Sequence, residues 1–162
     1  MSSVKVAVVM GSDSDWDVMK PAVDVLRDAK VDVVSEVVSA HRTPEKMMTF
    51  SQSAQSEGFK VIIAGAGGAA HLPGMIASMT RLPVIGVPVA LRTLDGMDSL
   101  LSIVQMPNGV PVATVGIGQA KNAGILALRI LGLENGSVAK SLEEMMAEQT
   151  RQSLTKVLPT SS

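Results

Sequence analysis

Short apolar runs and amphipathic segments alternate along the chain. The apolar runs, rich in valine, isoleucine and alanine, predict strands at residues 4–10, 31–38, 61–64, 84–87 and 112–115. The segments between them predict helices that begin near residue 14 and span residues 44–57, 72–79, 96–104 and 122–131. Strands that alternate with helices form a parallel sheet with right-handed crossovers and helices on both faces. We therefore expect a single α/β domain built as a three-layer α/β/α sandwich.

Local signals refine two of these elements. In the first helix, Met19, Ala22, Val23 and Leu26 fall on one face, which predicts the stripe that packs on the sheet. The second helix has Thr43 as its expected N-cap, Pro44 in its first turn and Gly58 beyond its end. The second strand is apolar along most of its length, which predicts that both of its faces are covered.

A further helix is expected after the alternating pattern, at residues 137–157. Ser137 is its expected cap, and Leu142, Met145 and Met146 lie along one side. We divide the chain into an α/β domain at residues 1–136 and a C-terminal helix and tail at residues 137–162. The Met-rich side is expected to pack on a neighbouring subunit, and its own domain is the alternative.

Composition excludes several classes of protein. The chain has 162 residues and no cysteine, and its N-terminal residues enter a strand without a signal-peptide pattern, so a cytoplasmic location is expected. No apolar run approaches the roughly 20 residues that a membrane span needs. A net charge of −1 without a basic stripe argues against a nucleic-acid partner. Aromatic residues are 2% of the chain, which leaves little to stack on a flavin.

The two histidines occupy equivalent places in the predicted sheet. His41 follows the second strand, with Arg42 beside it, and His71 follows the third strand. Open α/β sheets bind ligands at the carboxyl ends of their strands. Histidine titrates near neutrality, and the arginine fork matches a phosphate or carboxylate. This pairing indicates proton transfer on an anionic substrate.

Two glycine-containing loops complete the candidate site. Residues 10–16 offer a close backbone approach, two serine hydroxyls and a helix N-terminus, and the carboxylates of Asp13 and Asp15 suit a ribose diol. Residues 65–70 fit a relaxed dinucleotide fingerprint, but the acidic residue expected about 20 positions later is missing. We interpret this segment as a backbone-lined loop that approaches a small ligand closely.

Cofactor patterns are otherwise absent from the sequence. No nucleoside-triphosphate loop, zinc-ligand spacing or hydrolase nucleophile turn occurs, so neither a cofactor nor a metal is expected.

Four segments together resemble the class I PurE family, the N5-carboxyaminoimidazole ribonucleotide mutases of purine biosynthesis. They are residues 10–16, 39–44, 64–75 and 98–107, and the likeness spans about residues 4–132. The resemblance implies a flavodoxin-like sheet, a homo-octamer, a small ribonucleotide substrate and no cofactor. One departure is that residues 117–123 are about two residues shorter than the Ala-Gly-rich stretch usual in the family.

Carried over by position, the resemblance implies residue roles. His41 is the expected general acid and base, and His71 is the second catalytic candidate. Ser39 is expected to help bind phosphate, and residues 67–72 to line a loop that handles the carboxyl group. The complete set of substrate-binding candidates is Ser12, Asp15, Ser39, Arg42, Gly67, Ala70 and Leu72.

Two alternative functions remain open at this point. One is the related class II carboxylase, which uses free CO2; the Arg42–Thr43 pair and the Ala-Ala-His-Leu-Pro run from residue 69 favour the mutase. The other is a flavodoxin-like nucleotide-binding module without catalysis.

Overall fold

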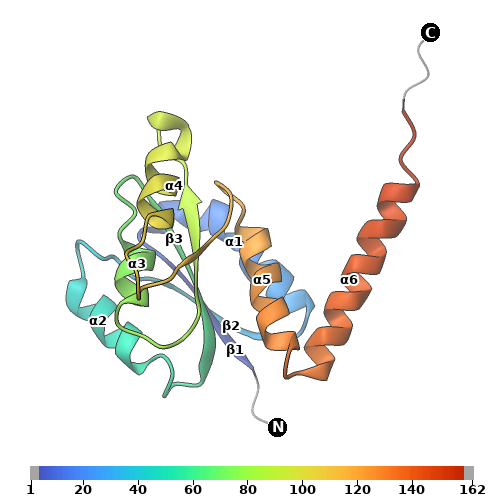
Figure 1. Ribbon diagram of the computed structural model, residues 1–162, viewed down its shortest axis with the longest axis horizontal. Coiled ribbons are helices and arrows are strands. Elements are labelled where there is room, and N and C mark those ends of the chain that lie inside the picture. Colours follow the sequence, from blue (N-terminus) through green and yellow to red (C-terminus); the bar gives the residue numbers. More distant parts are fainter. Residues whose placement is uncertain (1–3, 159–162) are drawn as a thin grey trace.

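The computed structural model describes residues 4–158, which form an open parallel sheet between two layers of helices (Figure 1). The strands are β1 (Lys5–Met10), β2 (Asp32–Val37), β3 (Phe59–Gly67), β4 (Val84–Val89) and β5 (Ala113–Thr114). The helices are α1 (Trp16–Asp28), α2 (Pro44–Ser53), α3 (Leu72–Ala77), α4 (Met97–Val104), α5 (Ala120–Gly132) and α6 (Gly136–Leu154). Short 3-10 turns, η1 (Asp13–Asp15) and η2 (Leu94–Gly96), precede α1 and α4.

The strand order is β2-β1-β3-β4-β5, and every pairing is parallel. This is the order of flavodoxin-like doubly wound sheets, in which the connections turn to opposite sides between β1 and β3. The predicted three-layer α/β architecture is therefore confirmed. The order also fixes the place for a ligand, because the loops after β1 and β3 diverge at this point and leave a crevice.

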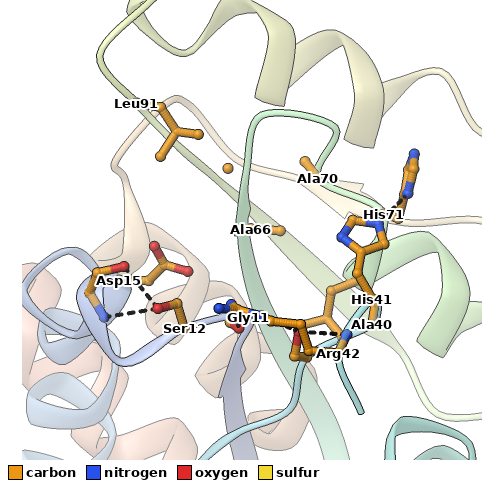
Figure 2. Close-up of a pocket in the computed structure, with 14 residues that line it drawn as sticks. Gly11, Ser12, Asp15, Ala40, His41, Arg42, Ala66, Ala70, His71 and Leu91 are labelled. Carbon is orange, nitrogen blue, oxygen red and sulfur yellow. Dashed lines mark hydrogen bonds between the residues drawn. The ribbon is translucent and has the colours of Figure 1, made fainter. Parts of the chain in front are cut away.

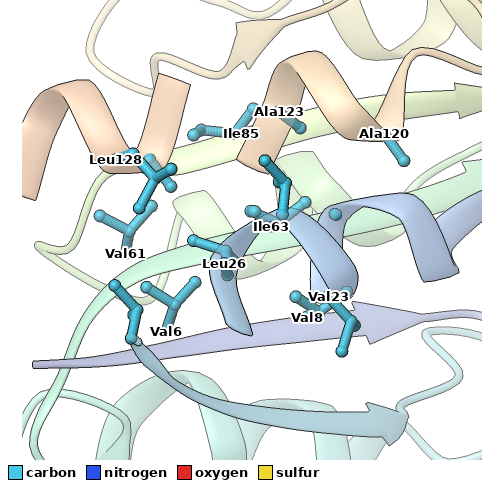
Figure 3. Packing of buried hydrophobic residues seen from close by; sticks show 14 of the residues in the cluster. Val6, Val8, Val23, Leu26, Val61, Ile63, Ile85, Ala120, Ala123 and Leu128 are labelled. Atoms are coloured by element: carbon cyan, nitrogen blue, oxygen red, sulfur yellow. The ribbon is translucent and has the colours of Figure 1, made fainter. Parts of the chain in front are cut away.

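Side chains that alternate along the strands form two separate cores. On one face, Val6, Val8 and Ile63 of the sheet pack with Leu26 of α1 and Leu128 of α5 (Figure 3). The opposite face packs mainly against α2, α3 and α4. The stripe predicted for α1 is completely buried, and truncating a leucine in such a core costs about 2–5 kcal/mol.

The expectation that β2 is covered on both faces is wrong. β2 lies at the edge of the sheet, where β1 is its one strand partner among residues 4–158, and it packs against α1. Val34 and Val37 are 37% and 40% exposed. A valine-rich run predicts a strand, but it does not reveal whether that strand has a second neighbour. The central strand β3, with β1 and β4 beside it, is buried along nearly its whole length.

Helix ends differ from the expected positions in two places. α2 ends at Ser53 rather than near Glu57, and a turn that includes left-handed Gly58, with φ of 90°, leads into β3. α6 begins one residue before the expected domain boundary and is capped by Asn135, not by Ser137. The Asn135 Oδ1 accepts the backbone N–H groups of Ser137 and Val138 at 3.1 and 3.2 Å.

The two halves of α6 have different surroundings. Val138 is buried in the core of its own chain, and Leu142 and Met145 pack against that core. Beyond them the helix projects away from the domain (Figure 1), and Met146 and Leu154 are 47% and 81% exposed. Residues 159–162 of the predicted tail lie outside the described residues. Within residues 4–158, no helix combines the length and the apolar character needed to cross a membrane.

Candidate active site

A cavity of about 270 Å³ opens at the carboxyl edge of the sheet, where the loops after β1, β2 and β3 meet (Figure 2). Each of the nine residues predicted from the sequence lines it. The set comprises Ser12 and Asp15 after β1, Ser39, His41 and Arg42 after β2, and Gly67, Ala70, His71 and Leu72 at the end of β3 and the start of α3. Segments separated by about thirty residues in the sequence therefore form one site.

The cavity has two chemically different ends. We call Ser12, Asp15, Ser39 and Arg42 the polar end, because they supply hydroxyl, carboxylate and guanidinium groups. We call His41, Gly67, Ala70, His71 and Leu72 the histidine end, where two imidazoles face small and apolar side chains. Figure 2 shows Ser12 and Asp15 on one side of the opening and the two histidines on the other.

Arg42 is oriented by hydrogen bonds to two different loops. Its Nε donates to the Ser39 hydroxyl at 3.3 Å, and its Nη2 donates to the Gly11 carbonyl at 3.1 Å. The Ser39 hydroxyl also accepts the Arg42 backbone N–H at 3.2 Å. The cation is thereby fixed across the loops after β1 and β2. Other N–H groups of the guanidinium stay free of these bonds and are available to an anion.

Thr43 has a different role from the expected one. It precedes α2, and Pro44 stands in the first turn as predicted, but the Thr43 side chain makes no capping hydrogen bond to the helix. Its hydroxyl donates to the Ser39 carbonyl at 3.0 Å and accepts the Ser39 N–H at 3.2 Å. Competing local bonds of this kind are typical of threonine. Thr43 therefore supports the backbone of Ser39 within the polar end.

The loop after β1 holds a buried carboxylate. The Ser12 hydroxyl caps η1 by accepting the Ser14 N–H at 3.3 Å. Asp15 makes no side-chain cap on α1 and is only 7% exposed. Burial raises the pKa of the Asp15 carboxyl, with a smaller contribution from Asp13; the Ser12 backbone hydrogen bond and the Arg42 charge act in the opposite direction. Hydrogen bonds donated by a ligand would stabilise the charged form of such a buried carboxylate.

The two histidines contact each other directly. The His41 Nε2 and His71 Nδ1 atoms are 2.7 Å apart, and the rings meet edge to face with centroids separated by 4.8 Å. A hydrogen bond between two imidazole nitrogens needs one proton between them, so one ring donates and the other accepts. Both side chains are exposed at the cavity. The pair can hold a proton and exchange it with a bound ligand.

The loop after β3 approaches its neighbours too closely for larger residues. A Cβ atom on Gly67 would lie 3.1 Å from the Val89 carbonyl and 2.8 Å from a Leu91 methyl group. Gly68 has φ of 68°, and Ala70 has φ of 46°, which is uncommon for a residue with a side chain. The glycine at position 67 is therefore required by close packing against Val89 and Leu91, and the loop brings backbone to the edge of the cavity.

Sequence reasoning missed Leu91 and two serines of α4. Leu91 lines the cavity just after β4, so the rule that placed the other loops at strand ends also applied to it. The Ser99 hydroxyl accepts the Gly68 N–H at 2.8 Å, and the Ser102 hydroxyl donates to the Ala69 carbonyl. Ser99 and Ser102 are three residues apart on a predicted helix, so they lie on the same helix face, and this spacing could have indicated that both contact one neighbouring segment.

The shortened segment at residues 117–123 lies outside the cavity lining. Its Gly118 N–H donates to the Pro88 carbonyl at 2.9 Å, which ties the segment to β4. Among residues 4–158, no three side chains of the types His, Asp or Glu gather closely enough to hold a metal ion.

Comparison with known proteins assigns the family. The model of the family described as AIR carboxylase matches residues 5–152. The chain belongs to this family. The AIR carboxylase match covers all three site loops and most of α6, so it includes each candidate residue described above.

Individual relatives agree with this assignment. A protein of Saccharolobus solfataricus named N5-carboxyaminoimidazole ribonucleotide mutase is 60% identical over 86% of this chain and 89% of its own length. A Candida glabrata protein named phosphoribosylaminoimidazole carboxylase is 58% identical over 93% of this chain, which corresponds to 26% of that longer protein. The crystal structure of Treponema denticola PurE superposes with a TM-score of 0.85 at 25% identity, over 93% of this chain and 94% of that one.

Proposed function

We propose that this protein is a mutase of de novo purine (IMP) biosynthesis. It converts N5-carboxyaminoimidazole ribonucleotide into 4-carboxy-5-aminoimidazole ribonucleotide by moving the carboxyl group from N5 to C4. The observation that carries the proposal is the 60% identity, over 86% of the chain, to a relative that bears this name. The paired histidines beside an oriented arginine at the switch point of the sheet support it, because they supply both proton transfer and anion binding.

The polar end has the chemistry to bind the ribonucleotide. Arg42 and the Ser12 and Ser39 hydroxyls would anchor the 5′-phosphate, since a guanidinium fork and neighbouring hydroxyls match its oxygens. Asp15 would accept hydrogen bonds from the ribose hydroxyls. Bound in this way, the nucleotide extends its base toward the histidine end of the same cavity.

The histidine end has the chemistry for carboxyl transfer. The carbamate C–N bond of the substrate breaks, which gives CO2 and the neutral aminoimidazole after the nitrogen gains a proton. The electron-rich C4 then attacks CO2, and the C4–H proton leaves to restore the aromatic ring. His41 would supply and remove the proton, with His71 as its hydrogen-bonding partner. The 67–72 loop, including Gly67, Ala70 and Leu72, would confine CO2, and no metal or organic cofactor takes part.

An isotope experiment separates the mutase from a carboxylase, the name carried by the Candida glabrata relative. The reaction is started from the N5-carboxylated nucleotide in buffer that contains labelled bicarbonate. The mutase transfers its own carboxyl group, so the early product carries little label. Full equilibration of label, at a rate proportional to the CO2 concentration, would identify the protein as a carboxylase. Tight binding of the nucleotide without turnover would instead favour the non-catalytic binding module.

We also propose that the protein is a cytoplasmic homo-octamer. Apolar side chains are exposed on α4, at Met97, Leu101 and Val104, and on the projecting half of α6, at Met146 and Leu154. These side chains support a surface that other subunits of the assembly cover. Eight chains of 16.9 kDa give about 135 kDa. Light scattering should give this mass. Deleting residues 146–162, which leaves Val138 and Met145 in the core, should lower it; a monomer with full activity would contradict the octamer.

A further inference from the structure

Ser99 is a buried polar residue that joins two parts of the molecule. Its side chain is completely buried at the start of α4. The hydroxyl accepts the Gly68 N–H at 2.8 Å and donates its own proton to the Val89 carbonyl at 2.7 Å. One hydroxyl therefore uses both its donor and an acceptor lone pair to connect the loop after β3 to the end of β4.

The segment that Ser99 holds has a backbone that requires support. Gly68 and Ala70 both have positive φ, at 68° and 46°. A residue such as Ala70 keeps this conformation only where the surrounding structure imposes it. α4 provides two fixed points for this purpose, because the Ser102 hydroxyl donates to the Ala69 carbonyl between the two residues.

The supported segment ends at the catalytic pair. His71 follows Ala70 directly, and its Nδ1 lies 2.7 Å from the His41 Nε2. His41 follows a different strand, β2, so a shift of the loop backbone after β3 would change the position of the His71 ring relative to His41. Within residues 4–158, the polar end makes no hydrogen bond to α4, because Ser12, Ser39 and Arg42 bond among the loops after β1 and β2.

We propose that Ser99 is a positioning residue for catalysis: its hydroxyl fixes the 67–71 loop so that His71 meets His41 and the loop closes on the reacting carboxyl group. The inference rests on the proposed function, because it assigns catalysis to the histidine end. It predicts that Ser99 affects turnover while leaving nucleotide binding nearly unchanged.

The test compares Ser99→Ala with Ser99→Thr, which keeps the hydroxyl. Ser99→Ala leaves the Gly68 N–H and the Val89 carbonyl without their partner, so the loop can move. We expect kcat to fall at least about tenfold, since a displacement of about 1 Å near a reacting group can cost a hundredfold. KM should stay within about threefold. Ser99→Thr should recover most of kcat, and Ser102→Ala should give a smaller loss in the same direction.

Ser51→Ala is the matched control. Ser51 is 1% exposed and donates to the Met47 carbonyl within α2, so its loss also removes a buried hydroxyl, but one that holds no part of the 67–71 loop. Thermal unfolding of all variants measures the general cost of losing a hydroxyl. A Ser99→Ala enzyme that loses stability like Ser51→Ala but keeps wild-type kcat would overturn the proposal. A raised KM with unchanged kcat would also overturn it.

Histidine spectroscopy makes the test independent of the assigned substrate. In protein labelled with 15N at histidine, the imidazole nitrogen signals of His41 and His71 report their shared hydrogen bond. These signals should change in Ser99→Ala and remain in Ser51→Ala. Unchanged signals would overturn the positioning role. If the wild-type protein fails to turn over the nucleotide but Ser99→Ala still changes these signals, the proposed function is refuted and the positioning role is not. If Ser99→Ala does not fold, Ser102→Ala is used for the same comparison.

Discussion

The two ends of the cavity are built in different ways. At the polar end, Ser12 bonds to Ser14 and Ser39 bonds to Arg42, so most contacts join residues within four positions of each other. At the histidine end, the decisive contacts join residues 30 to 33 positions apart: His41 with His71, Gly68 with Ser99, and Ala69 with Ser102. Each loop of the polar end is thus held mainly by local hydrogen bonds, and the Arg42 bond to the Gly11 carbonyl joins the two loops. At the histidine end, the main contacts all join segments that only the assembled sheet and α4 bring together.

This difference leads to a functional comparison. Under the proposed function, the polar end provides binding energy, and the histidine end provides proton transfer. Changes at the histidine end should lower kcat with little effect on affinity, and changes at the polar end should do the reverse. The following predictions test that division, from the largest expected effect to the smallest.

His41→Asn should cause the largest loss. Asparagine keeps a hydrogen-bonding group of similar size but cannot exchange a proton near neutral pH, and general acid–base catalysis contributes about 10²–10⁴-fold. We expect kcat to fall in that range while calorimetry shows nucleotide affinity close to wild type. A variant that keeps more than about a tenth of the wild-type rate would show that another residue carries the proton.

His71→Asn should have an intermediate effect on kcat, about 10- to 100-fold. It removes the partner 2.7 Å from His41 but leaves the proposed acid and base in place. The double variant should be no slower than His41→Asn alone, because residues that act as a unit are not additive. Independent, multiplying losses in a double-mutant cycle would mean that the two histidines act in separate steps.

Arg42→Ala should weaken nucleotide binding by roughly ten- to a hundred-fold, because charge-assisted hydrogen bonds to phosphate are worth about 1.5–3 kcal/mol. The kcat at saturating substrate should change little. Arg27→Ala is the control, since Arg27 is an exposed cation in the last turn of α1. Unchanged affinity by titration calorimetry would remove Arg42 from the binding site.

Asp15→Asn should weaken binding about tenfold yet make the free protein more stable at neutral pH. Burial raises the pKa of Asp15, so the folded state disfavours the charged carboxylate. The destabilisation is absent at pH values below the pKa of this carboxyl in the unfolded state. It grows as the pH rises from that value to the higher pKa of the folded state, and it is complete above it. The melting temperature of Asp15→Asn should therefore exceed that of wild type at pH 7, and the difference should shrink toward pH 4; a constant difference would contradict the assignment.

Ser12→Ala should have the smallest effect, a two- to tenfold loss of affinity. The Ser12 hydroxyl supplies a single hydrogen bond to the phosphate and is otherwise occupied with its own turn, so its net contribution should be about 0.5–1.5 kcal/mol, as for a typical hydrogen bond, below that of the charged Arg42 fork. Ser56→Ala serves as the comparison, because Ser56 is exposed outside the cavity and its hydroxyl donates within its own turn, to the Ser53 carbonyl at 2.7 Å. If Ser12→Ala lowered kcat more than it raised KM, the division between the two ends would be wrong.

Patterns within single elements were enough to predict the strands, the helices and the loops that line the cavity. The α1 stripe, the apolar runs of β3 and β4 and the glycine after α2 are read from spacing within one helix or strand, and such spacing reflects local geometry. The placement of His41 and His71 at strand ends followed from the same reading, because parallel strands share one carboxyl edge. The proposed roles of the nine site residues remain predictions.

The three-dimensional packing of the elements set which segments meet. It placed β2 at an exposed edge, gave the cap of α6 to Asn135 and paired His41 with His71. It also brought Ser99 of α4 to the backbone of the loop after β3. The physical reason is range: caps and helical periods act over a few residues, whereas strand order and hydrogen bonds across thirty residues depend on how the whole sheet packs.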